Sequence, residues 1–275
     1  MKSVVLSVVA ILVGAYLLFA AFLFFFQEQL IFFPSKNISF TPADVGLDAQ
    51  DVWMKSSNGN LIHGWFLEQN PEAITILFSH GNAGNISDRV STMQAFARMG
   101  FNVLLYDYQG YGLSYGTPSK RNILDDGIAA WEFLVKERGI HPDNILPVGR
   151  SLGGSVATYI AVNKQSKGLV LEETFTSIVD VAAHYYPIFP VRWLARVKLN
   201  TKEWLKDFGG VLLVAHSPTD EVIPYRMGRT LYETFQGEAF WLELQGRHSG
   251  GFAATGEAYK EAYLHFVDHV FGWQP

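Results

Sequence analysis

The stretch that decides the fold reads Ile145-Leu-Pro-Val-Gly149-Arg-Ser151-Leu-Gly153-Gly154-Ser-Val-Ala157 and contains the pattern Gly-x-Ser-x-Gly. An apolar run typical of a buried strand precedes the serine, and residues compatible with a helix follow it. Glycines on both sides let two backbone segments approach closely, so the pattern predicts a sharp strand-to-helix turn that exposes the Ser151 hydroxyl. The bare pattern also occurs by chance, but its strand-helix context and the extra glycine at 154 favour a nucleophile elbow over an ordinary turn.

Strand and helix signals alternate on both sides of this turn. Apolar runs rich in Val, Ile and Leu, as expected of strands buried on both faces, occupy residues 74–78, 103–106, 145–148, 169–171, 211–215 and 240–244. Apolar residues at helical spacing lie between several of them, at 86–96 and 124–135, and again at 259–270. Residues 52–55 and 61–67 flank a turn and predict an opening hairpin. The alternation predicts an α/β fold with a mostly parallel sheet covered by helices on both faces.

One interval breaks this alternation. Residues 174–208 carry no strand signal and several large apolar side chains, so we expect a small helical cap insertion there. Its apolar residues either line an acyl pocket or pack the cap itself: Tyr185, Tyr186, Phe189, Trp193 and Leu194. Residues 27–275 contain no linker, charge run or repeat, which predicts one domain that includes the cap.

An uncharged apolar run occupies residues 3–26. As a helix it would be about 36 Å long, enough to cross a hydrocarbon core of about 30 Å. A cleavable secretory signal is the alternative, but its apolar stretch is typically about 7–15 residues and ends at small residues. This run is longer and ends in Phe24-Phe25-Phe26, so we expect a retained transmembrane anchor.

The residues on either side of this run indicate on which side of the membrane, and how close to it, the rest of the chain should lie. Lys2 precedes the run, which favours a cytoplasmic N-terminus and a body outside the cytoplasm, although a single lysine decides it. The segment QLIFFP at 29–34 follows without a flexible linker, so the body should stay close to the bilayer. Phe32 and Phe33 either pack on the body or lie at the level of the lipid headgroups.

Composition excludes several classes of protein. A net charge of -5 with interspersed signs argues against a nucleic-acid partner, which would need a basic face. The absence of cysteine excludes disulfides, thiolate metal sites and a cysteine nucleophile. No acidic cluster indicates a metal, and the glycines at 110–116 do not match the dinucleotide fingerprint. We therefore expect no cofactor and no metal.

A serine nucleophile needs a base and an acid that orients the base. Asp220 follows the run 211–215 and His248 follows the run 240–244, so both are expected at the carboxyl edge of the sheet beside Ser151. The chain order serine, acid, histidine fits this architecture. Glu173 and Glu221 are the alternative acids. The other histidines near the strand ends, cap or last helix are more readily structural: His184, His216, His265 and His269.

An oxyanion site requires two backbone N–H donors aimed at the developing charge. The amide of Leu152, directly after the nucleophile, predicts one donor. The glycine-rich loop His80-Gly-Asn-Ala-Gly-Asn85 follows the run 74–78 and predicts the other through Asn82.

Five motifs in this order resemble one known family: the 80–85 loop, Asp-Tyr-Gln-Gly-Tyr-Gly at 107–112, Gly-Arg-Ser-Leu-Gly-Gly at 149–154, Asp-Glu-Val-Ile-Pro at 220–224 and Gly-Arg-His at 246–248. Together with the apolar N-terminus, they resemble the membrane-anchored abhydrolase-domain branch of the α/β-hydrolases, in the serine aminopeptidase-like clan. The resemblance implies Ser151 as nucleophile, Asp220 as acid and His248 as base. The chain departs from the family at Gln109, where an arginine is usual, and at Ser217, where a glycine usually follows the histidine.

The sequence therefore predicts a cofactor-free serine hydrolase that cleaves an ester or thioester in a small-molecule or acylated substrate. The resemblance implies thioesterases and lipid hydrolases among its relatives, and the anchor favours a lipid or an acylated protein. An amidase or peptidase with the same triad is one alternative. A non-catalytic, membrane-tethered binding protein on the same fold is another.

Overall fold

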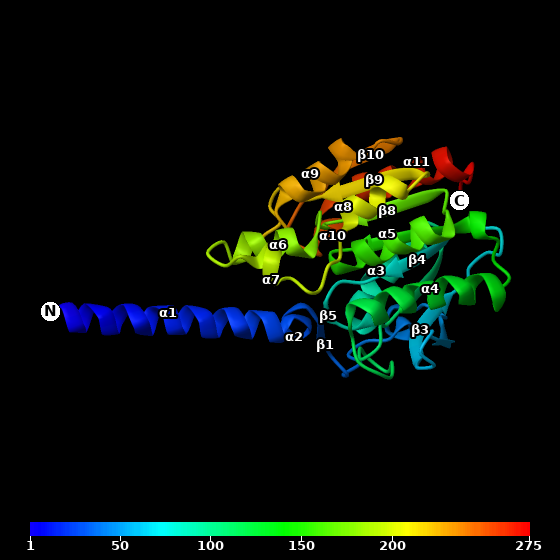
Figure 1. The fold of residues 1–275 in the computed structure, drawn as a ribbon. Helices are drawn as coiled ribbons and strands as arrows, with labels where there is room; N and C mark the ends of the chain where they lie inside the picture. The colour runs from blue at the N-terminus through cyan, green and yellow to red at the C-terminus, as the bar shows by residue number, and fades with distance from the viewer.

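An eight-stranded sheet forms the centre of the body in the computed structural model, which describes all 275 residues (Figure 1). Its spatial order is β10-β9-β8-β7-β4-β6-β3-β2. The strands are β2 Gln50–Lys55, β3 Leu61–Leu67, β4 Thr75–Ser79, β6 Asn102–Tyr106, β7 Ile145–Arg150, β8 Gly168–Glu172, β9 Val211–His216 and β10 Ala239–Glu243. The pairs β2–β3 and β3–β6 are antiparallel, and all others are parallel. The predicted hairpin and the mostly parallel sheet are confirmed.

Helices cover both faces of this sheet. They are α3 Val90–Arg98, α4 Lys120–Lys136, α5 Leu152–Lys164, α9 Tyr225–Thr234, α10 Gly251–Thr255 and α11 Glu257–Phe271, with 3-10 turns at Pro42–Val45, Ile86–Arg89, Pro142–Asn144 and Leu205–Asp207. Strand β6 shows why its run is continuously apolar. Leu104 packs in the layer that contains α4 and α5, whereas Val103 and Leu105 pack in the layer that contains α3 and α11. Alternate residues thus face opposite layers, and neither face contacts water.

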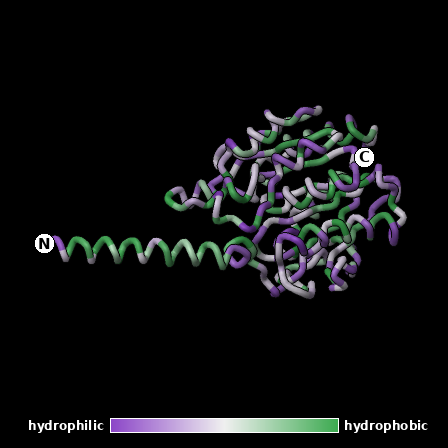
Figure 2. The backbone as a smooth tube through the Cα atoms, viewed as in Figure 1, coloured by the Kyte–Doolittle hydropathy of each residue, from purple (hydrophilic) through white to green (hydrophobic).

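The N-terminal segment projects from the body as one long helix, α1 Lys2–Phe25 (Figures 1 and 2). It is long and apolar enough to cross a membrane, although a signal sequence would share these properties, and only 6% of its most apolar window is buried. A short helix, α2 Gln27–Ile31, follows it, and then a two-residue strand, β1 Phe33–Pro34, pairs in parallel with β5 Ala83–Gly84. Phe32 is buried in the body, as one of the two expectations had it, whereas Phe33 is 51% exposed on its surface.

Residues 174–208 contain three short helices and no strand: α6 Ile178–Tyr185, α7 Val191–Leu194 and α8 Thr201–Trp204. Helix α8 packs against α5 of the body. Helices α6 and α7 instead extend beside the C-terminal part of α1 (Figure 1). We call residues 174–208 the cap.

A buried ion pair joins β7 and β8 behind the Gly-x-Ser-x-Gly turn. Arg150 and Glu172 are register partners, and the Arg150 Nη2 and Nε atoms lie 2.7 and 2.8 Å from Glu172 Oε2. The hydroxyls of Tyr259 and Tyr263 on α11 donate to Glu172 Oε1. Burial would lower the pKa of Arg150, but Glu172 outweighs it and raises that pKa, so the guanidinium stays charged. The pair therefore ties the sheet to the last helix.

Removing one partner of this pair should destabilise the fold more than removing one of its hydrogen bonds. We expect Glu172→Gln to lower the free energy of unfolding by roughly 3–5 kcal/mol, because it leaves the buried Arg150 charge uncompensated. Tyr263→Phe should cost about 1.5–3 kcal/mol, the usual range for a hydrogen bond to a charged group. Unfolding in detergent, followed by circular dichroism, measures both. Equal costs for the two variants would contradict a stabilising role for the pair.

Candidate active site

The turn between β7 and α5 holds Ser151 in a backbone conformation that side chains rarely adopt, with φ 55° and ψ −121°. The glycines explain how the chain reaches it. A Cβ on Gly149 would lie 2.2 Å from the Gly153 carbonyl oxygen, and a Cβ on Gly153 would lie 1.9 Å from the Ser79 carbonyl oxygen. Any side chain at either position would therefore separate α5 from the strands beneath it. The expected strand-turn-helix is present.

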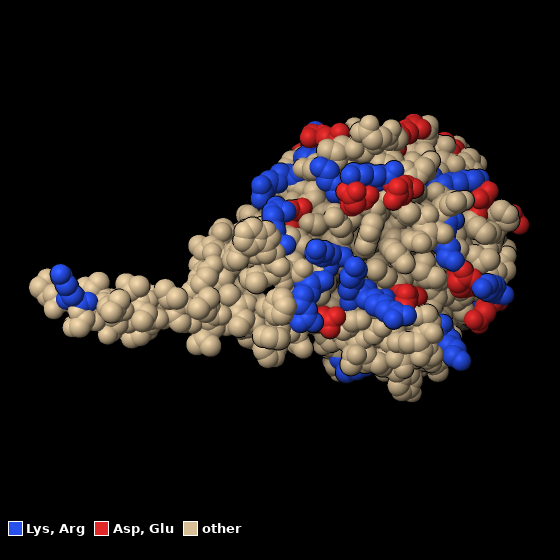
Figure 3. Space-filling view, in the orientation of Figure 1, with Lys and Arg blue, Asp and Glu red and all other residues tan.

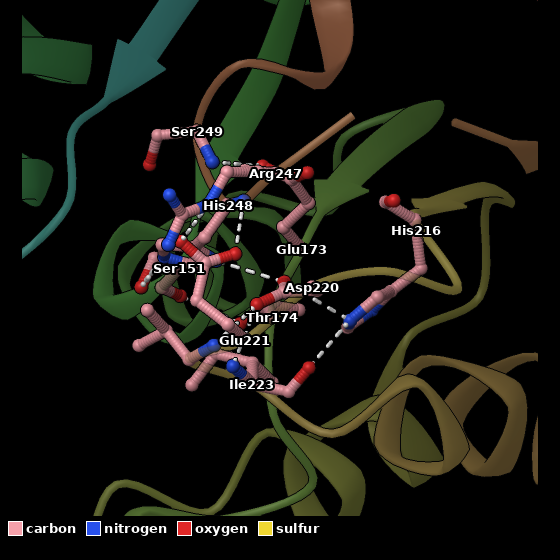
Figure 4. A network of polar contacts seen from close by, with 12 residues as sticks. Ser151, Glu173, Thr174, His216, Asp220, Glu221, Ile223, Arg247, His248 and Ser249 are labelled. Carbon is pink, nitrogen blue, oxygen red and sulfur yellow. Dashed lines mark hydrogen bonds and ion pairs between the residues drawn. The ribbon is translucent and has the colours of Figure 1, made fainter. Parts of the chain in front are cut away.

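Three side chains from separate loops form one chain of hydrogen bonds at this turn (Figure 4). The Ser151 Oγ lies 3.1 Å from His248 Nε2, and His248 Nδ1 lies 2.8 Å from Asp220 Oδ2. An ionised carboxylate can only accept, so Nδ1 carries the proton and Nε2 is free to accept from the serine hydroxyl. The structure thus brings together the three residues that the sequence analysis placed at strand ends.

Asp220 is fixed by several further donors. Its Oδ1 accepts from the amides of Val222 and Ile223, both at 2.8 Å, and the His216 Nε2 lies 3.3 Å from Oδ2. Burial by itself would raise the pKa of Asp220, but the hydrogen bonds from His216, His248 and the Ile223 amide outweigh it. The pKa of Asp220 is therefore held well below its usual range. The carboxylate remains ionised and oriented toward the imidazole.

The two alternative acids make different contacts. Glu173 Oε2 accepts from the Ser249 amide at 2.6 Å, and Glu221 Oε2 accepts from the His248 amide at 3.1 Å. Neither carboxylate accepts from the His248 ring. Burial raises the pKa of Glu173, and its Oε1 is buried without a hydrogen-bond partner. The geometry therefore places Asp220 at the imidazole and the two glutamates at the backbone of the histidine loop.

The four histidines that the sequence analysis interprets as structural are not members of the Ser151–His248–Asp220 chain. His216 is buried, and its Nε2 lies 3.0 Å from the Ile223 carbonyl oxygen, which fixes the loop that carries Asp220. His269 pairs with Glu238 on the body surface, with 2.9 Å between Nε2 and Oε1. The other two lie on cap helix α6 (His184) and on α11 (His265).

Gln109, which replaces the arginine usual in the resembling family, holds a loop rather than the reacting groups. Its side chain is buried, donates to Asp126 Oδ1 at 2.8 Å, and accepts from Asn58 and Asn60. Burial raises the pKa of Asp126 to about 6, in spite of hydrogen bonds from Gln109. The Gln109 amide thus links the β2–β3 turn to α4.

The loop after β4 lies directly beside the serine. A Cβ on Gly81 would lie 3.5 Å from the Ser151 Cβ. The next residue, Asn82, is held from two sides: its carbonyl accepts from the Phe33 amide and from the Tyr111 hydroxyl. Leu152 is the first residue of α5, so its amide has no acceptor within the helix. Both predicted oxyanion donors therefore lie on segments next to Ser151.

Some contacts at the site were not anticipated from the sequence. Thr174 Oγ1 donates to the Ser151 carbonyl at 2.6 Å, and the Asn82 side chain donates to the Ile31 carbonyl at 3.0 Å. Ser249 has a positive φ of 63°, which places its amide against Glu173. Thr174 is the second residue after β8, at the carboxyl edge of the sheet, and this position was the available signal for the first contact.

A metal could in principle use the carboxylates and imidazole here, because one donor atom each from Glu173, Asp220 and His248 lie within 4.8 Å of one another. Their hydrogen bonds argue for another role. Nδ1 of the imidazole donates to Asp220, and the aspartate oxygens accept from two amides and from the ring. Because these imidazole and aspartate atoms already take part in hydrogen bonds, the geometry favours a hydrogen-bonded triad over a cation site.

Comparison with known proteins places this geometry in a family. Residues 69–207 match the family model described as serine aminopeptidase, S33. The chain is 31% identical to the Arabidopsis thaliana alpha/beta hydrolase domain-containing protein WAV2, over 90% of this chain and 89% of that protein. It is 33% identical to the human alpha/beta hydrolase domain-containing protein 17B, over 73% of this chain and 70% of that protein.

A solved structure shares the fold at much lower identity. An esterase from Pyrococcus furiosus superposes with a TM-score of 0.72 at 17% identity, covering 88% of this chain and 98% of the esterase. The sheet order, the turn at Ser151 and these relatives agree on one assignment. This chain belongs to the serine aminopeptidase S33 family of the α/β-hydrolases and is a hydrolase of that fold.

Proposed function

We propose that the protein is a membrane-anchored serine hydrolase that cleaves carboxylic ester or thioester bonds through Ser151, His248 and Asp220. The observation that carries the proposal is the unbroken hydrogen-bond chain from Ser151 Oγ through the imidazole to a carboxylate whose pKa is lowered. The structural neighbour is an esterase, so the analogy of fold also supports an ester as the bond that is cleaved.

The reaction follows from the positions of these groups. Ser151 Oγ attacks the acyl carbon while His248 Nε2 takes its proton, and Asp220 stabilises the imidazolium. The amides of Asn82 and Leu152 would receive the oxyanion of the tetrahedral intermediate. The tetrahedral intermediate then collapses: the bond from the acyl carbon to the departing oxygen or sulfur breaks, that atom takes the proton from His248, and an acyl-enzyme remains. Water attacks this ester with His248 again as base, releases the carboxylic acid and restores the serine.

Two features of α1 support anchoring. Only Leu23 of the helix is buried, so the rest of its apolar surface requires an apolar surrounding. In addition, the following residue Gln27 is bound by the cap: its Nε2 donates to the Leu194 carbonyl, and its Oε1 accepts from the Arg196 and Val197 amides. A segment built into the body in this way favours retention over cleavage. With the anchor retained, the substrate is expected to be a lipid or an acylated protein.

Replacing the nucleophile should abolish turnover without unfolding the chain. We expect Ser151→Ala to lower esterase kcat/KM by about 10⁴-fold or more and to abolish labelling by a fluorophosphonate. Ser155→Ala is the matched control: Ser155 lies one helical turn later and contacts Thr201 within the core. Labelling should persist in that control. A folded wild-type chain that is never labelled would contradict the proposal.

The choice between carboxylates can be measured directly. Asp220→Asn should lower kcat by about 10⁴-fold, because the imidazole then loses the acceptor that fixes its tautomer. Glu173→Gln should cost far less, since Glu173 contacts the Ser249 amide rather than the ring. Single-turnover kinetics with one ester separate the two variants. A loss in Glu173→Gln equal to that in Asp220→Asn would assign the acid role to Glu173.

A peptidase remains the second candidate, because the matched family model is named for an aminopeptidase. The same triad can cleave both bond types, since its chemistry acts on an acyl carbon in either case. An ester and an amide with the same acyl group distinguish them. We expect a clear preference for the ester in kcat/KM, and a preference for the amide would favour the second candidate.

Anchoring can be tested on the full chain expressed in cells. After an alkaline carbonate wash, the protein should remain in the membrane fraction, because an inserted helix is not released by breaking electrostatic contacts. Mass spectrometry of its N-terminus should detect residues 1–26. A mature protein that lacks this segment would identify it as a cleaved signal instead.

A further inference from the structure

A cavity of about 350 Å³ lies between the membrane-proximal helices and the cap. Thirteen of its fourteen lining residues are hydrophobic, and they come from both sides: Leu23, Leu30 and Ile31 from α1 and α2, and Ile178, Ala182 and Leu194 among those from the cap. The exception is Gln27, whose side-chain amide is hydrogen-bonded to the backbone of the cap. The volume of the cavity falls in the range of about 300–1,000 Å³ that is usual for small-molecule sites, and its hydrophobic walls suit an apolar ligand.

The walls of the cavity are bonded to the loops of the active site. On one side, the carbonyl of the lining residue Ile31 accepts from the Asn82 side chain at 3.0 Å. On the other side, the hydroxyl of the lining residue Tyr185 donates to the Val222 carbonyl at 2.7 Å, two residues after Asp220. Residues of both walls therefore contact the loops that carry a proposed oxyanion donor and the proposed acid.

The cap also lies beside the C-terminal part of α1 (Figure 1). The Tyr16 hydroxyl donates to the Ile188 carbonyl at 3.0 Å, and the Tyr16 ring stacks on Phe189 with 4.7 Å between centroids. Tyr16 lies about 14 Å along the helix before its end at Phe25. If α1 spans the bilayer, the loop between α6 and α7 lies in the same leaflet as Tyr16, which it contacts. Part of this loop is green, and therefore hydrophobic, in Figure 2, and Ile188 is 73% exposed.

The positions of the basic side chains indicate where the lipid headgroups should lie. Lys and Arg side chains gather where α1 meets the body (Figure 3). Lys120, Arg121 and Arg196 line one hollow there together with Phe25 and Glu28. Basic side chains at this level would contact lipid phosphates, which places the cavity at the boundary between headgroups and hydrocarbon.

From these observations we propose that the cavity binds the long acyl chain of a membrane-embedded ester or thioester, and that α1 forms one wall of the substrate site as well as the anchor. The inference rests on the proposed function, because Ser151 must attack the carbonyl at the head of that chain. The chain would enter from the leaflet without crossing water, so its transfer costs little. The scissile group would remain at the polar boundary, near the triad.

Two adjacent alanines of α6 provide a matched test in the full chain. Ala182 lines the cavity, whereas Ala183 lines a separate hollow with Asp180, Arg192 and Arg226. Each is replaced by phenylalanine, and kcat/KM is measured for p-nitrophenyl butyrate and palmitate in phosphatidylcholine vesicles. Ala182→Phe should lower the palmitate-to-butyrate ratio by about tenfold or more, since each excluded methylene loses its burial. Ala183→Phe should keep the wild-type ratio.

The outcomes separate this inference from the proposed function. If wild-type protein cleaves neither ester and Ser151 is not labelled, the hydrolase proposal fails. If wild-type protein cleaves both esters and the two alanine variants have the same ratio, only the acyl site is contradicted. Repeating the comparison with a monoacylglycerol and an S-palmitoylated peptide in the same vesicles identifies whether lipid or acyl-protein supplies the chain.

A measurement on the unmodified protein covers the case in which Ala182→Phe does not fold. A palmitoyl-length alkyl fluorophosphonate with a terminal diazirine is attached to Ser151 and then photoactivated in vesicles. Crosslinked peptides should come from residues 23–31 and from residues 178–197, the two walls of the cavity. Crosslinks confined to other parts of the body, or to lipid alone, would overturn the assignment.

Discussion

The close contact between α5 and the strands beneath it is the constraint on which the rest of the site depends. Because Gly153 lies against the Ser79 carbonyl, the helix begins almost in contact with β4 and β7, and Ser151 is forced to positive φ. Ser79 and Gly149 are register partners, so the loop that follows β4 leaves the sheet next to the serine. One tight turn thus positions both Ser151 and the loop that contains Asn82. Backbone strain of this kind is tolerated when the surrounding structure holds it.

The polar groups around this turn are arranged in two levels. Beneath the serine, the Arg150–Glu172 pair and two tyrosine hydroxyls form a buried network that bonds the sheet to α11. Above it, Asp220 is supplied with donors from amides and from two histidines. The first level holds the scaffold rigid, and the second keeps one carboxylate charged at the edge of the sheet. Preorganised charge of this sort costs no rearrangement during a reaction.

Much of this arrangement could be predicted, for physical reasons that also explain the gaps. Strands such as β6 are buried on both faces and therefore read as continuous apolar runs. Residues directly after such strands meet at one edge, so Asp220 and His248 could be placed beside Ser151 before their contacts were known. The β1–β5 pairing could not be predicted, because two residues carry no periodicity. The preference of His248 for Asp220 over Glu173 depends on loop geometry that no local pattern encodes.

The segment between α1 and the sheet is part of the body, although its sequence looks like an extension of the anchor. Phe33 bonds to Asn82 through the backbone, and β1 supplies the partner that β5 needs. Gln27 holds the cap. A shortened version made for crystallisation or for assay in plain buffer should therefore begin no later than residue 27. One that starts at residue 35 would lose the strand that pairs with β5 beside the Ser151 turn, and it would lose the glutamine that fastens the cap to the body.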